Sequence, residues 1–362
     1  MKIDGKTSHN SPSLRFPEFT GEWEYFSIND VCSEFKSGKN IKADLISSNG
    51  NFPVYGGNGL RGYTSSYNHD GLYVLIGRQG ALCGNVRSVF GKIYITEHAI
   101  AVAGNEKSDT NFLHYLFLKM NLGQYSDQSA QPGLAVNKLL KLKVLLPSIS
   151  EQIKIAKLLS LLDERIAVQS RLIEDLKKLR CAVSNKLFQS VKGVVIPLSG
   201  ISNIVKGKQI NGDFLAEVGE YYVMNGGTEP SGYYDNYNVE ANTISISEGG
   251  NSCGYVQFNR MPFWSGGHCY TIQDIVSDVE TLYLYHYLKS KEDSIMKLRI
   301  GTGLPNIQKK DLAEFKVIIP AIEQQRTISN ILSLLERKNE IEGQLLIAMR
   351  TEKQYLLRQM FI

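Results

Sequence analysis

The strongest constraint on this chain is that it carries the same pattern twice. The segment ISEQIKIAKLLSLLDERI, which begins at Ile149, returns 173 residues later as IEQQRTISNILSLLERKNEI, and each copy follows a β-like segment that ends in proline. Upstream, IGRQGALCGNV (76–86) is repeated as ISEGGNSCGYV (246–256). A repeat of this length predicts two copies of one globular domain with its helix, and therefore pseudo-two-fold symmetry.

Length and composition agree with two domains of a globular protein. The chain has 362 residues, of which 43% are hydrophobic and 21% charged, and its net charge of +4 permits nucleic-acid binding without requiring it. No run of 18 uncharged apolar residues exists, and the N-terminus lacks the apolar core of a secretory signal. The five cysteines form no CxxC pair, which favours a reducing compartment. We therefore expect a cytoplasmic protein without a membrane segment.

Two kinds of segment alternate along the chain. Short runs rich in Val, Ile and Tyr, broken by Gly and Asn, indicate strand-rich domains, and one amphipathic helix is expected in each, at 111–121 and 281–291. Between and after these domains lie long segments almost free of Gly and Pro. We divide the chain into an N-terminal extension (1–18), a first strand-rich domain (19–148), a first long helix (149–190), a second strand-rich domain (191–320) and a second long helix (321–362).

The two long helices show the spacing of a coiled coil. Apolar residues recur at alternating steps of four and three, and this 3.5-residue period favours helix–helix packing over a helix that lies on a sheet. The expected seam is formed by Ile155, Leu159, Leu162, Ile166, Gln169, Ile173, Leu176, Leu332, Leu335, Glu342, Leu346 and Met349. The predicted fold class is α+β, with two similar strand-rich domains joined by two long antiparallel coiled-coil helices.

Some seam positions are polar, and they occur at matched places in the repeat. If the helices run antiparallel, we expect Gln169 to meet Glu342, Arg180 to meet Glu336, and Lys353 to meet Asp163 or Glu164. Polar seam residues commonly fix register and orientation. The alternative is that these long side chains reach water and specify nothing.

The sequence contains none of the catalytic motifs that we sought. The phosphate loop GxxxxGK[ST], HExxH, GxSxG and the catalytic loops of DNA methyltransferases are all missing from it. His98 and His268 are the only histidines at matched positions, and the spacing of the nearby cysteines does not suit structural zinc. We expect these two histidines in the core or supporting other residues, and we expect no catalytic residue and no metal site.

Glycine-flanked loops in both copies offer side chains that can read DNA. Base edges are read by Arg, Lys, Asn and Gln, and phosphates by Lys, Arg and backbone amides. The candidates are Lys39, Asn40, Asn58, Arg61, Tyr63, Arg78, Gln79, Arg87, Gln131 and Asn137 in the first copy, and Lys208, Gln209, Asn225, Tyr233, Tyr234, Asn251, Gln257, Arg260, Arg299, Asn306, Gln308 and Lys309 in the second. The alternative is ordinary turn chemistry on a solvated surface.

The framework residues are repeated between the two copies, whereas the loop residues differ. Arg78 and Gln79 of the first copy stand at the positions of Glu248 and Gly249 in the second. This divergence is expected if each copy reads a different short sequence.

The entry segment LRFPEFTGEWE (14–24), the Gly-Lys turn that opens each copy and the P-x-I-x-x-Q helix starts resemble the specificity subunit of type I restriction–modification systems. The resemblance covers essentially the whole chain. It implies two target recognition domains that each read one half of a bipartite, asymmetric site in double-stranded DNA, and helices that set the gap and dock two methyltransferase subunits. It also implies that restriction subunits join through that complex, and that S-adenosylmethionine, ATP and Mg belong to the partner subunits, because this subunit is not itself an enzyme.

Three alternatives remain open at this stage. The nearest is a specificity subunit of a modification-only or combined restriction–methylation enzyme. A repeated β-domain that binds glycans on a coiled-coil stalk fits the Gly/Tyr/Asn loops but not the cysteine usage. A nuclease or methyltransferase with unrecognised catalytic residues would modify DNA by itself when given S-adenosylmethionine or Mg²⁺.

Overall fold

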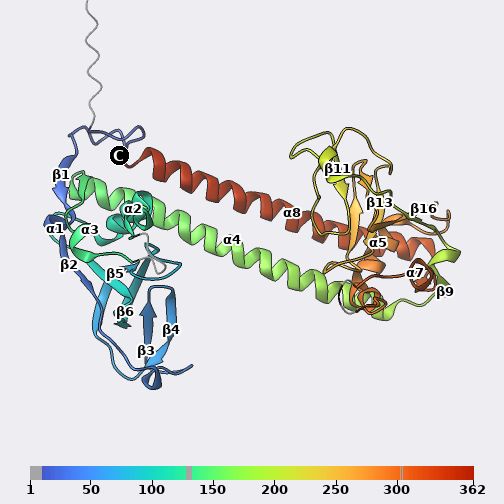
Figure 1. Cartoon of the computed structure of the whole chain (residues 1–362), viewed down its shortest axis with the longest axis horizontal. Coiled ribbons are helices and arrows are strands. Elements are labelled where there is room, and N and C mark those ends of the chain that lie inside the picture. Colours follow the sequence, from blue (N-terminus) through green and yellow to red (C-terminus); the bar gives the residue numbers. More distant parts are fainter. Residues whose placement is uncertain (1–9, 128–132, 302, 304) are drawn as a thin grey trace, which may run out of the picture. The chain divides into compact units, whose positions relative to one another are not determined.

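The computed structural model describes residues 10–127, 133–301, 303 and 305–362. Its contacts divide the chain into two compact units. Unit 1 comprises residues 1–170 and 345–362, and unit 2 comprises residues 171–344. Two long helices, α4 (Ile149–Ser190) and α8 (Ile322–Gln359), each contribute one part to unit 1 and the other to unit 2 (Figure 1).

Unit 1 is built around a six-stranded sheet of order β2-β7-β5-β6-β3-β4. The strands are β2 (Cys32–Ser37), β3 (Phe52–Gly56), β4 (Gly59–Thr64), β5 (His69–Gly77), β6 (Val86–Ile95) and β7 (Ala99–Gly104). A separate antiparallel pair is formed by β1 (Glu24–Ser27) and β8 (Lys143–Leu146). The shorter helices are α1 (Ile28–Val31), α2 (Thr110–Met120) and α3 (Val136–Leu139). The helix predicted at 111–121 is therefore confirmed.

Unit 2 repeats the order of strands and helices of unit 1, except that one long strand is replaced by two short ones. Its strands are β9 (Val194–Pro197), β10 (Asn203–Lys206), β11 (Tyr221–Met224), β12 (Tyr233–Tyr234), β13 (Thr243–Ser247), β14 (Val256–Asn259), β15 (Trp264–Ser265), β16 (Cys269–Gln273) and β17 (Lys316–Ile319). Its short helices are α5 (Thr281–Ser290), α6 (Glu292–Met296) and α7 (Lys309–Ala313), and α5 confirms the helix predicted at 281–291.

The sheet of unit 2 is divided into β10-β16-β13-β14 and β12-β11-β15. The ten-residue strand β6 of unit 1 corresponds here to two short strands, β14 and β15, separated by residues 260–263. This segment contains Pro262, which has no N–H to donate to a strand ladder. The parallel pairing nevertheless survives, because β11 pairs with β15 as β3 pairs with β6.

The long helices pack against each other in antiparallel fashion within each unit. In unit 1, Leu158 and Leu159 near the start of α4 share a core with Leu356 and Leu357 near the end of α8. In unit 2, Leu187 near the end of α4 shares a core with Ile328 near the start of α8. Each predicted seam residue is buried or half-buried: Ile155, Leu159, Leu162, Ile166, Gln169, Ile173, Leu176, Leu332, Leu335, Glu342, Leu346 and Met349.

Two of the predicted polar contacts along the seam are confirmed. In unit 1, Lys353 Nζ lies 2.5 Å from Asp163 Oδ1, and in unit 2, Arg180 lies 3.4 Å from Glu336 Oε1. Glu342 is buried and pairs with Lys338, one helical turn before it, at 2.5 Å. These three charged seam residues therefore each pair with a side chain of opposite charge.

A buried glutamine fixes the start of each long helix. The Gln152 amide donates to the carbonyl oxygens of Pro147 and Lys107, and its Oε1 accepts from Asp109 N, all at 2.9 Å. Gln325 makes the same three bonds in unit 2, at 2.8–2.9 Å. Both side chains are fully buried. The P-x-I-x-x-Q motif thus joins the last strand of each domain, the cap of its amphipathic helix and the long helix.

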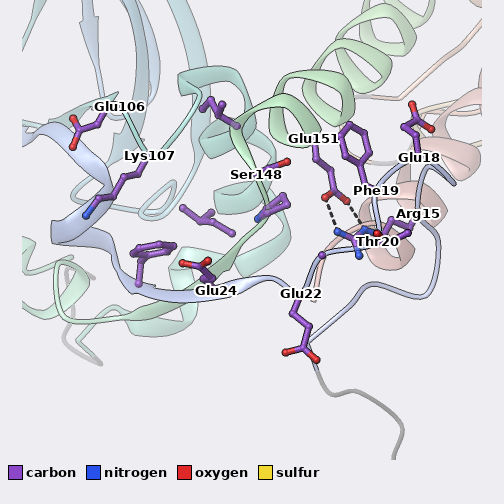
Figure 2. A pocket seen from close by; sticks show the side chains of 15 residues that line it. Arg15, Glu18, Phe19, Thr20, Glu22, Glu24, Glu106, Lys107, Ser148 and Glu151 are labelled. Carbon is purple, nitrogen blue, oxygen red and sulfur yellow. Dashed lines mark hydrogen bonds and ion pairs between the residues drawn. The ribbon is translucent and has the colours of Figure 1, made fainter.

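The segment before β1 is tied to the helices of unit 1. Leu14 N donates to Gln359 O, and the Arg15 guanidinium forms two 2.7 Å bonds to the buried carboxylate of Glu151 (Figure 2). Arg15 and Glu151 line a cavity of about 570 Å³ together with Glu24, Lys107 and Ser148. The sequence predicted an N-terminal extension over residues 1–18, and its residues 1–9 lie outside the described part of the chain.

Candidate nucleic-acid interface

The loop after β5 in unit 1 is a rigid backbone structure. Gly84 N donates to Gly77 O at 2.7 Å, and Cys83 N donates to Gly80 O at 2.9 Å. Gly84 has φ of +85°, and a side chain there would collide with the backbone of Gly123. A glycine is therefore required at this turn.

The same loop follows β13 in unit 2. Gly254 N donates to Ser247 O at 2.8 Å, and Cys253 N donates to Gly250 O at 3.1 Å. Gly254 repeats the positive φ of Gly84, at +92°. The two units therefore present one backbone framework at this edge of the sheet.

One residue in each loop occupies the centre of this framework. Arg78 N donates to His98 O, and Arg78 O accepts from Leu134 N, both at 2.9 Å. At the matched position, Glu248 N donates to His268 O at 2.9 Å, and Glu248 O accepts from Ile307 N at 2.8 Å. The backbone is thus identical in its bonding, whereas a guanidinium in unit 1 is replaced by a carboxylate in unit 2.

A cysteine supports each of these residues from behind. Cys83 Sγ donates to Arg78 O at 3.3 Å, and Cys253 Sγ donates to Glu248 O at 3.0 Å. Burial raises the pKa of both thiols, so each remains protonated and able to donate. The matched cysteines noted in the sequence are structural, and all five cysteines of the chain are free.

Several of the predicted residues of unit 1 gather around Arg78. Its guanidinium donates to Ser37 Oγ at 3.1 Å, and the neighbouring Gln79 lies 3.0 Å from His98 Nδ1. A side chain built on Gly59 would meet the Arg87 guanidinium, and one built on Gly56 would meet the Arg61 side chain, so both arginines lie beside the turn from β3 to β4. Asn58 stands in the same turn, next to Gly57, where an added side chain would meet Arg78 N. Lys39 N donates to Ile95 O, and the carbonyl of the following Asn40 accepts from Tyr94 OH.

A pocket of about 510 Å³ lies at the corresponding place in unit 2. Lys206, Asn225, Glu248, His268 and Asn306 line it. Asn225 Oδ1 accepts from His268 N at 3.2 Å, and Gln209 lies against Gly267. Lys208 is exposed close by, with its backbone bound to Ser265, and Asn251 follows the pocket residue Gly250.

Other predicted residues lie elsewhere. Tyr63 pairs with Pro53 at the far end of its hairpin, and Tyr233 holds the equivalent place in unit 2, where Tyr234 packs on Trp264. Arg260 follows the opposite end of β14 and lies 3.6 Å from Glu340 of α8. The remaining predicted residues lie on separate elements. They are Gln257 on β14, Arg299 after α6, Gln308 and Lys309 at the start of α7, and the exposed Asn137 on α3. Gln131 lies outside the described residues.

The matched histidines were expected either in the core or in support of other residues; the core position is wrong, whereas the supporting role agrees with the structure. The side chains of His98 and His268 are 45% and 64% exposed, and each borders the residues that gather at the loop. Their carbonyl groups, which hold Arg78 and Glu248, explain why the backbone repeats here. Within the described residues, no group of three His, Cys, Asp or Glu side chains is placed to hold a metal ion.

Sequence reasoning did not select Glu248 as a candidate, because acidic residues are uncommon at a phosphate-rich surface. Glu248 is buried, and its Oε1 accepts from Lys206 Nζ at 2.6 Å and from Tyr270 OH at 3.0 Å. Burial, together with this carboxylate, raises the pKa of Tyr270, which therefore acts as a donor. The repeat had already paired Glu248 with Arg78 as a divergent position, and the structure adds its buried partners Lys206 and Tyr270.

Comparison with known proteins assigns the chain to a protein family. A family model for the type I restriction modification DNA specificity domain matches the chain twice, over residues 20–178 and 191–349. The chain belongs to this family. The predicted resemblance and the predicted α+β class with two similar domains and two long helices are confirmed.

Specificity subunits of several bacteria are similar to this member of the family. The EcoprrI specificity subunit of Escherichia coli is 45% identical over 154 residues, which cover 41% of this chain and 38% of that protein. A putative type I specificity subunit of Mycoplasma genitalium is 24% identical over 92% of both chains. The crystal structure of a type I restriction-modification S subunit from M. genitalium superposes with a TM-score of 0.77, covering 97% of this chain and 99% of that one at 22% identity. That likeness extends the shared fold to almost the entire chain.

In the described part of this specificity-family chain, none of the helices is long and apolar enough to cross a membrane.

Proposed function

We propose that this chain is the DNA sequence-recognition subunit of a type I restriction–modification complex. Each strand-rich domain, over residues 19–148 and 191–320, reads one half of a bipartite, asymmetric site in double-stranded DNA. The family supports this proposal, since its model is described as a DNA specificity domain and matches both halves of the chain. Bases are read by side chains presented on a rigid backbone, and the two loops described above have that character.

One observation carries the proposal. The loops after β5 and β13 have the same backbone hydrogen bonds, yet they present Arg78 in one unit and Glu248 in the other. A guanidinium only donates hydrogen bonds, whereas a carboxylate only accepts them, so the two loops select opposite base edges. A duplicated framework with opposite chemistry at its centre suits an asymmetric site.

The long helices supply a surface for partner subunits. Exposed apolar residues occur at matched positions of the two helices and form what we call the apolar strips. In unit 1 the strip consists of Leu161, Val168 and Leu345, and in unit 2 of Leu334, Ile341 and Leu172. In unit 1 these residues line a groove of about 750 Å³ between α4 and α8. Exposed apolar patches on long helices indicate protein partners.

Because the strips are equivalent, two copies of the same partner fit them. We propose that these partners are two methyltransferase subunits, and that restriction subunits join through the resulting complex. On this proposal the chain itself is not an enzyme, and its partners supply adenine methylation and ATP-dependent cleavage with S-adenosylmethionine, ATP and Mg. A cytoplasmic location belongs to the same proposal and is supported by the five free cysteines.

Docking can be tested by charge insertion into one strip at a time. We expect Leu161→Glu to remove one methyltransferase subunit from the purified complex, Leu334→Glu to remove the other, and the double variant to remove both. Native mass spectrometry measures the stoichiometry. Phe90→Glu, a change at an exposed apolar residue of β6, serves as the control and should leave two subunits bound. Retention of both subunits by the double variant would contradict the proposal.

DNA recognition can be tested by replacing one domain. Exchange of residues 19–148 for the corresponding domain of another family member should replace one half-site and leave the other unchanged, as measured by sequencing of methylated bases in the host genome. Loss of both half-sites from a folded complex argues against independent domains.

The helices between the domains are proposed to set the gap between half-sites, as the recognition elements of paired DNA-binding modules must be spaced to match the duplex. Insertion of four residues after Gln169 should lengthen the gap without altering either half-site. The idea fails if bases within a half-site change while the gap stays the same. A modification-only enzyme with the same specificity subunit remains the second candidate, distinguished by whether restriction subunits copurify.

A further inference from the structure

Glu248 has an acceptor atom that the protein does not use. Its side chain is 9% exposed, and Oε1 is occupied by Lys206 and Tyr270. Oε2 is buried and has no hydrogen-bond partner among the described residues, and the imidazole Nδ1 of His268 lies 3.8 Å from it, beyond hydrogen-bond distance. A buried carboxylate oxygen without a donor is costly, so its retention calls for a ligand.

The surroundings of Oε2 define what this ligand must offer. Glu248 lines the open pocket with Asn225, His268 and Asn306, on the loop framework that matches the Arg78 loop. Lys206, which also lines this pocket, already balances the negative charge, because its Nζ lies 2.6 Å from Oε1. The pocket therefore suits a neutral hydrogen-bond donor rather than a second cation.

Base edges in the major groove present only two such donors, the amino groups of cytosine and adenine. Adenine carries the N7 acceptor beside its amino group, and this lone pair would face the carboxylate unfavourably. Cytosine presents its N4 amino group beside its own C5–H, with no acceptor on the same base in the groove. Guanine and thymine present acceptors at this place in the groove and would be repelled.

We propose that Glu248 Oε2 accepts a hydrogen bond from the N4 amino group of one cytosine in the half-site read by unit 2. This inference rests on the proposed function. It makes Glu248 a specificity-determining residue held in place by Lys206 and Tyr270. Unit 1 cannot read its half-site in this way, because Arg78 stands at the matched position.

The first test uses the unaltered protein in its purified complex with the methyltransferase subunits, on a duplex that carries its methylated site. Each cytosine of the site is replaced in turn by N4-methylcytosine, which keeps base pairing but replaces the hydrogen that points into the major groove. We expect one cytosine in one half-site at which this replacement weakens binding about 10-fold, the effect of losing a base contact. If no cytosine shows such an effect, the proposal is overturned without reference to any variant.

The second test assigns that cytosine to Glu248. Glu248→Gln keeps the shape of the side chain but adds a donor, and Gln pairs with adenine. The variant should lose its sensitivity to N4-methylation at that position and should methylate sites with adenine there, while the other half-site and the gap stay unchanged. Glu314→Gln, an exposed glutamate of the same unit, is the matched control and should behave as the unaltered protein.

The outcomes separate this inference from the function on which it rests. If the unaltered complex recognises no sequence, the proposed function fails. If it recognises a bipartite site but Glu248→Gln retains the same cytosine and the same sensitivity, only the assignment of Glu248 fails. A donor supplied by a bound water or by residues of a partner would give this second result.

Discussion

Lys353 and Arg180 occupy the same place in the repeat, and each forms an ion pair with an acidic residue of the other long helix. Lys353 of α8 binds Asp163 of α4 in unit 1, and Arg180 of α4 binds Glu336 of α8 in unit 2. A tyrosine completes each group, because Tyr115 OH and Tyr285 OH donate to the same two carboxylates at 2.9 Å. Burial raises the pKa of both tyrosines, which keeps them as donors.

These ion pairs should contribute to helix pairing. Double-mutant cycles of Lys353→Ala with Asp163→Ala, and of Arg180→Ala with Glu336→Ala, should each give a coupling free energy of about 1 kcal/mol in urea unfolding, since the groups are partly shielded from water. The exposed pair Lys178–Asp175 of α4 is the control and should give almost none. Equal coupling in all three cycles would mean that seam position is irrelevant.

The buried glutamines should be among the most sensitive polar residues. Gln152→Ala leaves Asp109 N, Lys107 O and Pro147 O without this partner, and Gln325→Ala has the same effect in unit 2. We expect each change to lower the free energy of unfolding by about 3 kcal/mol, because buried polar groups lose their bonds. Hydrogen exchange at the Asp109 or Glu280 amide should accelerate in the corresponding variant. Gln324→Ala, at the exposed neighbour of Gln325, should change neither quantity.

Two histidines should make stability depend on pH. Burial is the main cause that lowers the pKa of His114 and of His286 from 6.5 to about 4, and Lys353 and Arg180, respectively, act in the same direction. Asp163 opposes the shift at His114, and Arg260 adds to it at His286. Since the unfolded chain binds these protons first, stability is full above pH 6.5 and is lost as the pH falls toward 4.

The repeat offers natural replacements for both histidines. Leu284 stands at the position of His114, and Leu116 at that of His286. The double variant His114→Leu, His286→Leu should therefore lose less stability than the unaltered protein between pH 6.5 and 4, by about 2 kcal/mol for each histidine. Unfolding in urea at several pH values measures the difference. His98→Leu, at an exposed position, should retain the original slope.

Local and repeated features of this fold were readable from the sequence, whereas features set by tertiary contacts were not. The helices at 110–120 and 281–290 and the ion pairs Lys353–Asp163 and Arg180–Glu336 follow from periodicity and from the repeat. The parallel pairing of β3 with β6 joins segments about forty residues apart and leaves no periodic signal. The repeat pairs Glu248 with Arg78, but the burial of its carboxylate could not be predicted, because the partners Lys206 and Tyr270 come from two other strands.

The last prediction concerns the segment before β1. Arg15 makes a bidentate pair with Glu151, whose side chain is 1% exposed, and hydrogen bonding to this carboxylate raises the pKa of Arg15. Arg15→Leu would leave Glu151 buried without a cation, and loss of one partner of a buried pair costs about 3 kcal/mol or more. We expect a fall of this size in unfolding free energy and faster proteolysis near residues 10–22.

Unit 2 supplies the compensating change. At the positions of Arg15 and Glu151 it carries Leu187 and Gln324, so the repeat manages without this ion pair. The double variant Arg15→Leu, Glu151→Gln removes the buried charge together with its partner and should recover most of the lost stability. Glu18→Ala, which breaks only the exposed pair with Lys154, should cost under about 1 kcal/mol. If Arg15→Leu is as mild as Glu18→Ala, the N-terminal segment is not anchored through Glu151, and the contact between Leu14 and Gln359 must hold it instead.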